Sequence, residues 1–71
     1  MHFMELITMI KERRESLQVT QETLAELSGV GLRTVKQFES GKGNPTLITL
    51  KKLGDALGLE LTLIVKTKSN N

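Results

Sequence analysis

The sequence contains no cysteine, and only one of its 71 residues is a histidine, His2. Without cysteine, the chain can form neither a disulfide framework nor a metal site built on thiolates. It has no apolar run near the roughly 20 residues that a membrane span needs, and it does not begin with the basic and then apolar pattern of a signal peptide. We therefore expect a soluble cytoplasmic protein that holds no metal and no cofactor.

Residues suited to catalysis are also scarce. A nucleophilic site needs a base such as histidine beside the nucleophile, and His2 lies near the first residue. General acid–base catalysis needs titratable groups that converge in a pocket, whereas most acidic residues here fall on helix faces predicted to be exposed. An enzyme is therefore the weakest interpretation of this sequence.

Positive charge is concentrated in the middle of the chain. Residues 1–30 carry three basic and five acidic side chains, a net charge of −2, whereas residues 31–52 carry five basic and one acidic, a net charge of +4. The rest of the chain is neutral, which leaves +2 in total. This distribution favours a local anionic partner such as a phosphate backbone, although an ordinary solvated face could show the same charges.

The length predicts a single domain over residues 1–71, with a core so small that a second subunit would be a natural source of buried surface. Apolar residues recur at intervals of three and four, which predicts four helices. Their expected ranges are 5–17, 21–27, 31–38 and 47–57, within a helical core of about residues 5–58. Thr20 and Thr46 are suitable N-caps, and Gly29 suits the left-handed position after the second helix. Leu27 and Leu47 are expected on inward faces.

A short turn, Ser28-Gly29-Val30-Gly31, joins the two middle helices. Small Ala25 lies where these helices must approach each other closely, and Val30, Val35 and Phe38 can form the wedge between them. The pattern is typical of a helix–turn–helix unit, in which the second helix turns its polar face outward.

Around this turn, the stretch TQETLAELSGV…TVKQFESGKGNPTLITLKKLGDALG resembles the Xre or lambda Cro/cI-type helix–turn–helix family. The resemblance covers roughly residues 10–58. It implies a mainly α fold, a lambda-repressor-like DNA-binding domain of four to five helices, with the third helix in the major groove of DNA. It also implies a sequence-specific transcriptional regulator, which we interpret as a repressor that binds double-stranded DNA at a palindromic operator. The alternative is a protein-interaction module that neutralises a partner protein without binding DNA itself.

By position, the resemblance assigns contacts with base edges to the third helix and contacts with phosphates to residues around it. Arginine and lysine donate to guanine, glutamine pairs with adenine, and leucine can contact a thymine methyl group. The base-contacting positions are Leu32, Arg33, Lys36 and Gln37. The phosphate-contacting positions are Gln21, Lys42, Gly43 and Asn44. Gly31 stands where the family usually has serine or threonine, which weakens the expected N-cap of the third helix.

Two charged residues have a different expected role. Arg14 falls on the apolar stripe of the first helix, where an unpaired charge would cost free energy. Glu39 follows the inward Phe38, and the family pairs these two positions as a buried ion pair. We therefore expect Arg14 and Glu39 to be structural, whereas the neighbouring Arg13 is expected to be solvated.

After Gly58 the period of the pattern changes to two, which predicts a β-strand over about residues 59–67. Its apolar face would consist of Leu59, Leu61, Leu63 and Val65. The sequence offers no second strand, so we expect this strand to pair with its twin in a homodimer. A strand folded back on its own subunit, or a helix, is the alternative. The segment resembles that of HipB-like antitoxins, which implies a HipA-like kinase toxin as a further partner.

Overall fold

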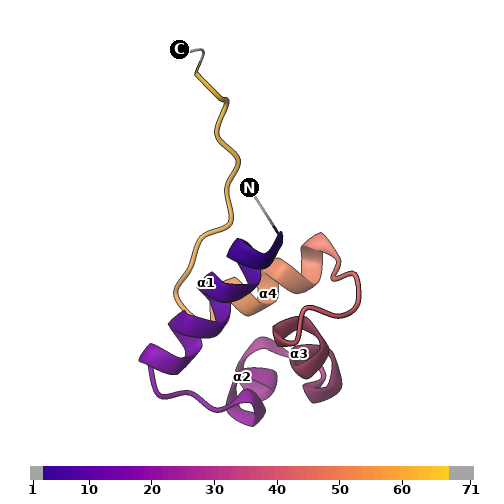
Figure 1. The fold of residues 1–71 in the computed structure, drawn as a ribbon. Helices are drawn as coiled ribbons and strands as arrows, with labels where there is room; N and C mark the ends of the chain where they lie inside the picture. Colours follow the sequence, from indigo (N-terminus) through magenta and orange to yellow (C-terminus); the bar gives the residue numbers. More distant parts are fainter. Residues whose placement is uncertain (1–2, 68–71) are drawn as a thin grey trace.

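A computed structural model describes residues 3–67 of the chain. Within that range it contains four α-helices and no β-strand. The helices are α1 (Phe3–Ser16), α2 (Gln21–Ser28), α3 (Leu32–Glu39) and α4 (Leu47–Ala56). In Figure 1, α2 and α3 lie side by side at one end of the molecule, and residues 59–67 extend away from them at the other. The mainly α fold predicted from the sequence is therefore confirmed.

The core lies where the four helices meet. Its buried apolar side chains come from every helix, from the turn between α2 and α3 and from the residue that follows α4: Ile10, Leu24, Val30, Val35, Phe38, Leu53 and Leu57. Burial of each such side chain stabilises the fold by about 1.5–3 kcal/mol, before the cost of ordering the chain. Val30, Val35 and Phe38 fill the space beside α2, as expected of the wedge in a helix–turn–helix unit.

Two leucines that were expected in the core lie on the surface. Leu27 is 62% exposed and Leu47 is 71% exposed. The buried stripe of α2 is centred between Leu24 and Ala25, and at about 100° per residue Leu27 falls roughly 110° away from its centre. Leu47 is the first residue of α4, and its side chain lies beyond the reach of the core. Both expectations were wrong because apolar spacing alone does not locate the centre of a short helical stripe.

The predicted N-caps are present. The Thr20 hydroxyl accepts a hydrogen bond from the Thr23 N–H (3.0 Å), and the Thr46 hydroxyl accepts one from the Thr49 N–H (3.1 Å). Gly31 occupies the N-cap position of α3 and contributes no side-chain hydrogen bond. The start of α3 therefore leaves more of its backbone donors free than the start of α2 or α4 does.

The turn between α2 and α3 provides a stability prediction. Gly29 ends α2 in the left-handed conformation (φ +74°), whereas Gly31 has φ −61°, and a Cβ atom at either position would meet no other atom within 4 Å. Backbone strain is therefore the main difference between the two sites. Gly29→Ser is expected to lower the free energy of unfolding by about 1 kcal/mol, whereas Gly31→Ser should raise it by a few tenths through a new N-cap. Urea denaturation of both variants checks this, and equal losses would contradict it.

The β-strand expected at residues 59–67 is not formed. These residues are extended, but they pair with no other backbone segment in the described part of the chain. Leu59 packs against the core, whereas Leu63 is 97% exposed. A ladder needs a neighbouring backbone, and the four helices use most of the chain before residue 59. The strand prediction was therefore wrong for the single chain. None of the described helices is long and apolar enough to cross a membrane.

Candidate nucleic-acid interface

The polar face of α3 is held outward by the burial of its other side. Val35 and Phe38 are buried in the core, which leaves Arg33, Lys36 and Gln37 exposed to solvent. These three positions are spaced at three and four residues, so they share one face of the helix. Leu32, the fourth predicted base-contacting residue, is partly buried. The fold therefore presents three of the predicted residues together on one exposed surface.

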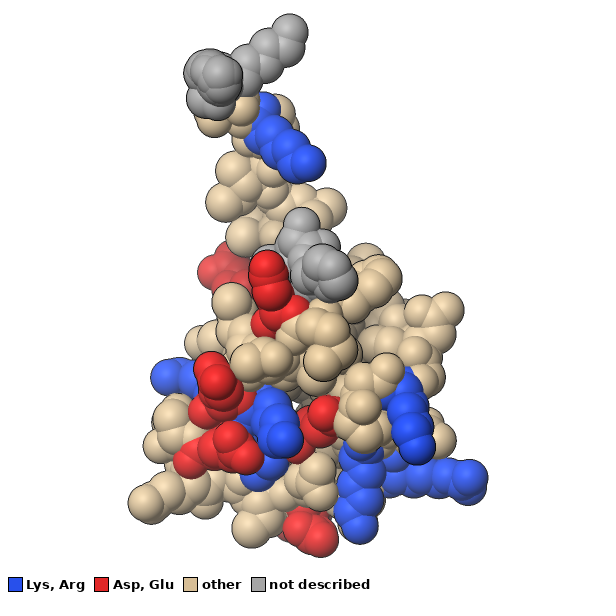
Figure 2. All heavy atoms as spheres, in the orientation of Figure 1, with Lys and Arg blue, Asp and Glu red and all other residues tan. Residues whose placement is uncertain are grey.

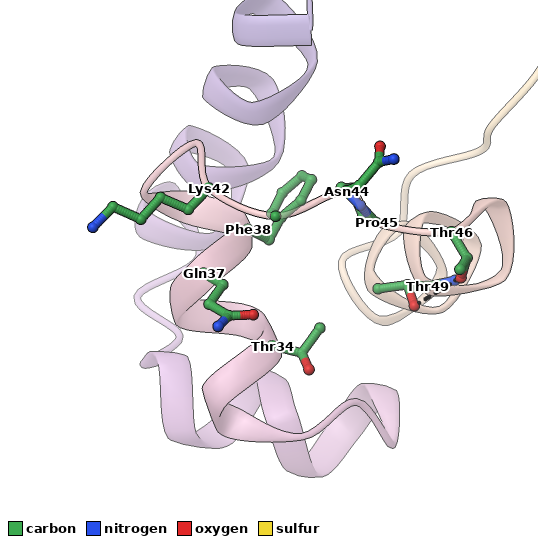
Figure 3. A pocket seen from close by; sticks show the side chains of 9 residues that line it. Thr34, Gln37, Phe38, Lys42, Asn44, Pro45, Thr46 and Thr49 are labelled. Carbon is green, nitrogen blue, oxygen red and sulfur yellow. Dashed lines mark hydrogen bonds between the residues drawn. The ribbon is translucent and has the colours of Figure 1, made fainter.

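A shallow hollow lies between α3 and the start of α4. Figure 3 shows Thr34 and Gln37 of α3 on one side of this hollow, and the N-cap Thr46 and Thr49 of α4 on the other. Thr34 was not singled out from the sequence, although its spacing of three from Gln37 could have found it. The arrangement adds hydroxyl groups, which both donate and accept hydrogen bonds, beside the polar face of α3.

A backbone hydrogen bond connects the loop after α3 to that helix. The N–H of Lys42 donates a hydrogen bond to the carbonyl of Gln37 (3.0 Å), and Lys42, Gly43 and Asn44 are all exposed. In Figure 3 the side chain of Lys42 points away from the hollow. The fold thus brings three of the four predicted phosphate-contacting residues beside the predicted base-contacting face.

Charges are unevenly spread over the surface. In Figure 2, basic side chains gather over the end of the molecule where α3 lies in Figure 1, whereas many acidic side chains in this view lie toward α1 and α2. Arg33, Lys36 and Lys42 are the cations of α3 and the loop that follows it, and all three are exposed. This end of the molecule is therefore suited to an anionic partner.

Gln21 occupies a different environment from the other predicted phosphate-contacting residues. It is partly buried at the start of α2, and its side-chain Nε2 donates a hydrogen bond to Glu39 Oε1 (3.0 Å). An amide nitrogen carries two N–H donors, so this bond leaves one for another acceptor. The sequence did not indicate that Gln21 contacts Glu39, because 18 residues separate them.

Arg14 and Glu39 form a bidentate ion pair between α1 and the end of α3. Arg14 Nε lies 2.6 Å from Glu39 Oε2 and Arg14 Nη2 lies 2.9 Å from Oε1, and the two side chains are only 11% and 3% exposed. Arg14 Nη1 also donates to the carbonyl of Val19 (2.7 Å). With Gln21, these groups satisfy the buried carboxylate from two helices and connect α1, α2 and α3 at one point.

The charges in this network stabilise each other. The hydrogen bond to Glu39 raises the pKa of Arg14, although burial acts in the opposite direction. Burial alone would raise the pKa of Glu39, but the hydrogen bonds from Arg14 and then Gln21 outweigh it and leave that pKa lowered. Both residues are therefore charged at neutral pH, and Glu39 stays ionised below the usual range of a glutamic acid.

Comparison with known proteins identifies the family to which the chain belongs. Residues 10–64, most of the chain, match the model of a family described as helix-turn-helix. The chain belongs to the helix–turn–helix family. The Xre-type resemblance expected from the sequence is thereby confirmed, and α2, the turn at residues 29–31 and α3 are the unit that gives the family its description.

Several curated proteins resemble this helix–turn–helix chain. An uncharacterized HTH-type transcriptional regulator of Methanothermobacter thermautotrophicus is 43% identical over 75% of this chain and 77% of its own length. The cryptic phage CTXphi transcriptional repressor RstR of Vibrio cholerae is 39% identical over 73% of this chain, which matches only half of that repressor. The HTH-type regulator YqaF of Bacillus subtilis is 30% identical over 86% of this chain and 80% of its own length. No solved structure matches the chain.

Proposed function

We propose that this helix–turn–helix protein is a sequence-specific DNA-binding transcriptional regulator, and that it represses from a palindromic operator. The observation that carries the proposal is the exposed face of α3. Arg33, Lys36 and Gln37 share this face, while Val35 and Phe38 on the same helix are buried in the core. Arginine, lysine and glutamine are the side chains that read guanine and adenine in the major groove. The name of the Vibrio relative, a transcriptional repressor, supports the direction of regulation.

In this proposal the residues around α3 bind the DNA backbone. Lys42 supplies a positive charge, and Gly43 and Asn44 supply backbone and amide donors in the same exposed loop. Gln21 lies at the N-terminus of α2, where free backbone N–H groups already favour an anion. Its second amide N–H would donate to a phosphate while the first remains on Glu39. Leu32 would contact a thymine methyl group from the edge of the same face.

The proposal includes a homodimer, because one recognition helix reads too few base pairs to be selective. Residues 59–67 supply the interface: two copies would pair as antiparallel strands and bury the alternate leucines that are exposed in the single chain. In Figure 1 this segment points away from α3, so pairing would leave the DNA-facing surface open.

An antitoxin role is the second candidate function. It rests on the HipB-like pattern of residues 59–67 and on the exposed apolar side chains of that segment, which would then contribute to binding a HipA-like kinase toxin. A protein-interaction module that no longer binds DNA would use the same segment. A kinase-like toxin gene beside the gene for this protein would favour the antitoxin role, and failure to bind any DNA would favour the interaction module.

Two substitutions test the DNA-binding proposal. Arg33→Ala is expected to weaken binding to the preferred operator by about 1–3 kcal/mol and to relax the preference at one base position. Lys42→Ala should weaken binding to all sequences about equally and reduce the slope of log K against log salt by about 0.9, because one phosphate contact is lost. Selection from random DNA, followed by binding measurements at several salt concentrations, gives both quantities.

Lys11→Ala is the matched control, because it removes one exposed positive charge from α1, outside both the predicted DNA contacts and residues 59–67. It should leave both the base preference and the salt slope close to those of the unaltered protein. A selection with Arg33→Ala that returned the same operator with the same preference would overturn the assignment of base contacts to α3.

A further inference from the structure

Two backbone hydrogen bonds close the end of α4. Gly58 adopts the left-handed conformation (φ +72°), its N–H donates to the carbonyl of Asp55 (3.3 Å), and the N–H of Leu59 donates to the carbonyl of Gly54 (2.8 Å). This pair of bonds is the Schellman motif. It turns the chain sharply at Gly58, just before the extended segment. The carbonyl of Leu57 is left as an acceptor without a backbone partner.

A side chain from α1 satisfies that acceptor. Arg13 Nε donates to the carbonyl of Leu57 (2.9 Å), 44 residues away in the sequence. A cation at the C-terminus of a helix is favoured by the helix dipole. Arg13 forms no ion pair with any described residue, so this carbonyl is its structural partner. Arg13 is exposed, as expected from the sequence, but its hydrogen bond to Leu57 was not anticipated.

The guanidinium of Arg13 also packs against the turn itself. A Cβ atom built on Gly58 would lie 3.3 Å from Arg13 Nη2, so a side chain at that position would displace the guanidinium by a few tenths of an ångström. Arg13 thus holds the chain where residues 59–67 leave the helical body. The next residue, Arg14, holds the end of α3 through Glu39. Two adjacent arginines of α1 therefore contact the end of α3 and the point where residues 59–67 begin.

We propose that Arg13 is a positioning residue, which sets the direction of residues 59–67 relative to α3 and so determines the distance between the two recognition helices of the dimer. The inference rests on the dimeric DNA-binding function proposed above. Half-sites on DNA must face the two recognition helices at one fixed separation, because each added base pair both shifts and rotates the second half-site. If residues 59–67 leave the helices in one fixed direction, the dimer should bind operators with one half-site spacing tightly. It should bind operators whose spacing is one base pair longer or shorter more weakly.

The test compares operators that differ only in half-site spacing. The operator is first selected from random DNA with the unaltered protein, and one base pair is then inserted or removed at its centre. The unaltered protein should bind the altered operators about tenfold more weakly, a penalty similar to that of one mismatched base pair. Arg13→Met retains a long apolar stem but no donor, and it should bind all three spacings within about threefold of one another.

Two further variants and one control distinguish a positioning role from a general effect on stability. Arg13→Lys retains a donor for the Leu57 carbonyl and should restore much of the spacing preference. Gly58→Ala strains the same turn from the other side and should weaken the preference as Arg13→Met does. Lys11→Met removes an exposed charge from the same helix that forms no ion pair with any described residue, and it should keep the spacing preference of the unaltered protein. Affinity for a single half-site should be unchanged in every variant.

The possible outcomes are distinct. An unaltered spacing preference in Arg13→Met would overturn the positioning role, while the dimeric DNA-binding function would stand. Loss of affinity for a single half-site along with the spacing preference would show that Arg13 only supports the fold, which would also overturn it. Absence of any palindromic operator for the unaltered protein would instead overturn the proposed function.

Discussion

Arg14→Ala and Glu39→Ala are each expected to lower the free energy of unfolding by about 3–5 kcal/mol, because each leaves its partner's charge buried without compensation. The two side chains are almost fully buried and share two hydrogen bonds. In Arg14→Ala the carboxylate would keep only the hydrogen bond from Gln21, and the Val19 carbonyl would lose a donor. A loss of this size is a large fraction of the stability of a small domain.

Urea denaturation at neutral pH measures these losses, and an exposed ion pair in the same protein is the control. Lys51 and Asp55 are one turn apart on α4, 3.1 Å from each other, and both are largely exposed. Lys51→Ala should therefore cost no more than about 0.5 kcal/mol. Similar small losses for Arg14→Ala, Glu39→Ala and Lys51→Ala would show that the buried network contributes no more than a surface pair.

The contribution of Glu39 should also depend on pH. Its pKa is lowered in the folded protein, so its stabilising effect is present above the pKa of the unfolded chain, about 4.3, and is lost as the pH falls through the folded value. The difference in stability between the unaltered protein and Glu39→Gln should therefore be constant near pH 7 and shrink in acid. A difference that grew toward low pH would contradict the direction of the pKa shift.

Leu63→Pro is expected to have the largest effect on DNA binding, with operator affinity reduced by about 100-fold or more, because the two half-sites would no longer be bound by one dimer. Proline cannot donate to a β-ladder, and in the proposed dimer residue 63 lies near the middle of the paired segment. The helices should remain intact, since the side chain of Leu63 is exposed and residues 59–67 belong to no helix.

Sedimentation and circular dichroism distinguish these effects. Leu63→Pro should sediment as a monomer with an unchanged helical signal, whereas Leu63→Val, which retains both the N–H donor and β-propensity, should remain a dimer. A stable Leu63→Pro dimer with normal operator affinity would place the interface on another surface.

Local features of the fold were predictable from the sequence because neighbouring residues determine them. The caps at Thr20 and Thr46 and the left-handed Gly29 depend on side chains and dihedral angles within one helical turn. The buried wedge of Val30, Val35 and Phe38 followed from the spacing around that turn. These features locate α3 and decide which of its sides faces solvent.

Other features could not be predicted because they depend on distant parts of the chain. Nothing near Arg13 in the sequence distinguishes it from a solvated arginine, since its acceptor is a backbone carbonyl at the end of α4. Gln21 was assigned only to a phosphate, because its contact with Glu39 requires the packing of α2 against α3. The alternating residues after Gly58 indicated an extended segment, but whether it pairs depends on a neighbour that the single chain does not provide.

The extended segment also bears on how the protein avoids aggregation. Residues 61–65 are rich in β-branched and leucine side chains, contain no proline, and expose their backbone in the single chain, a combination that favours indiscriminate association with other chains. Two charged residues, Glu60 and Lys66, flank this stretch and disfavour uncontrolled stacking.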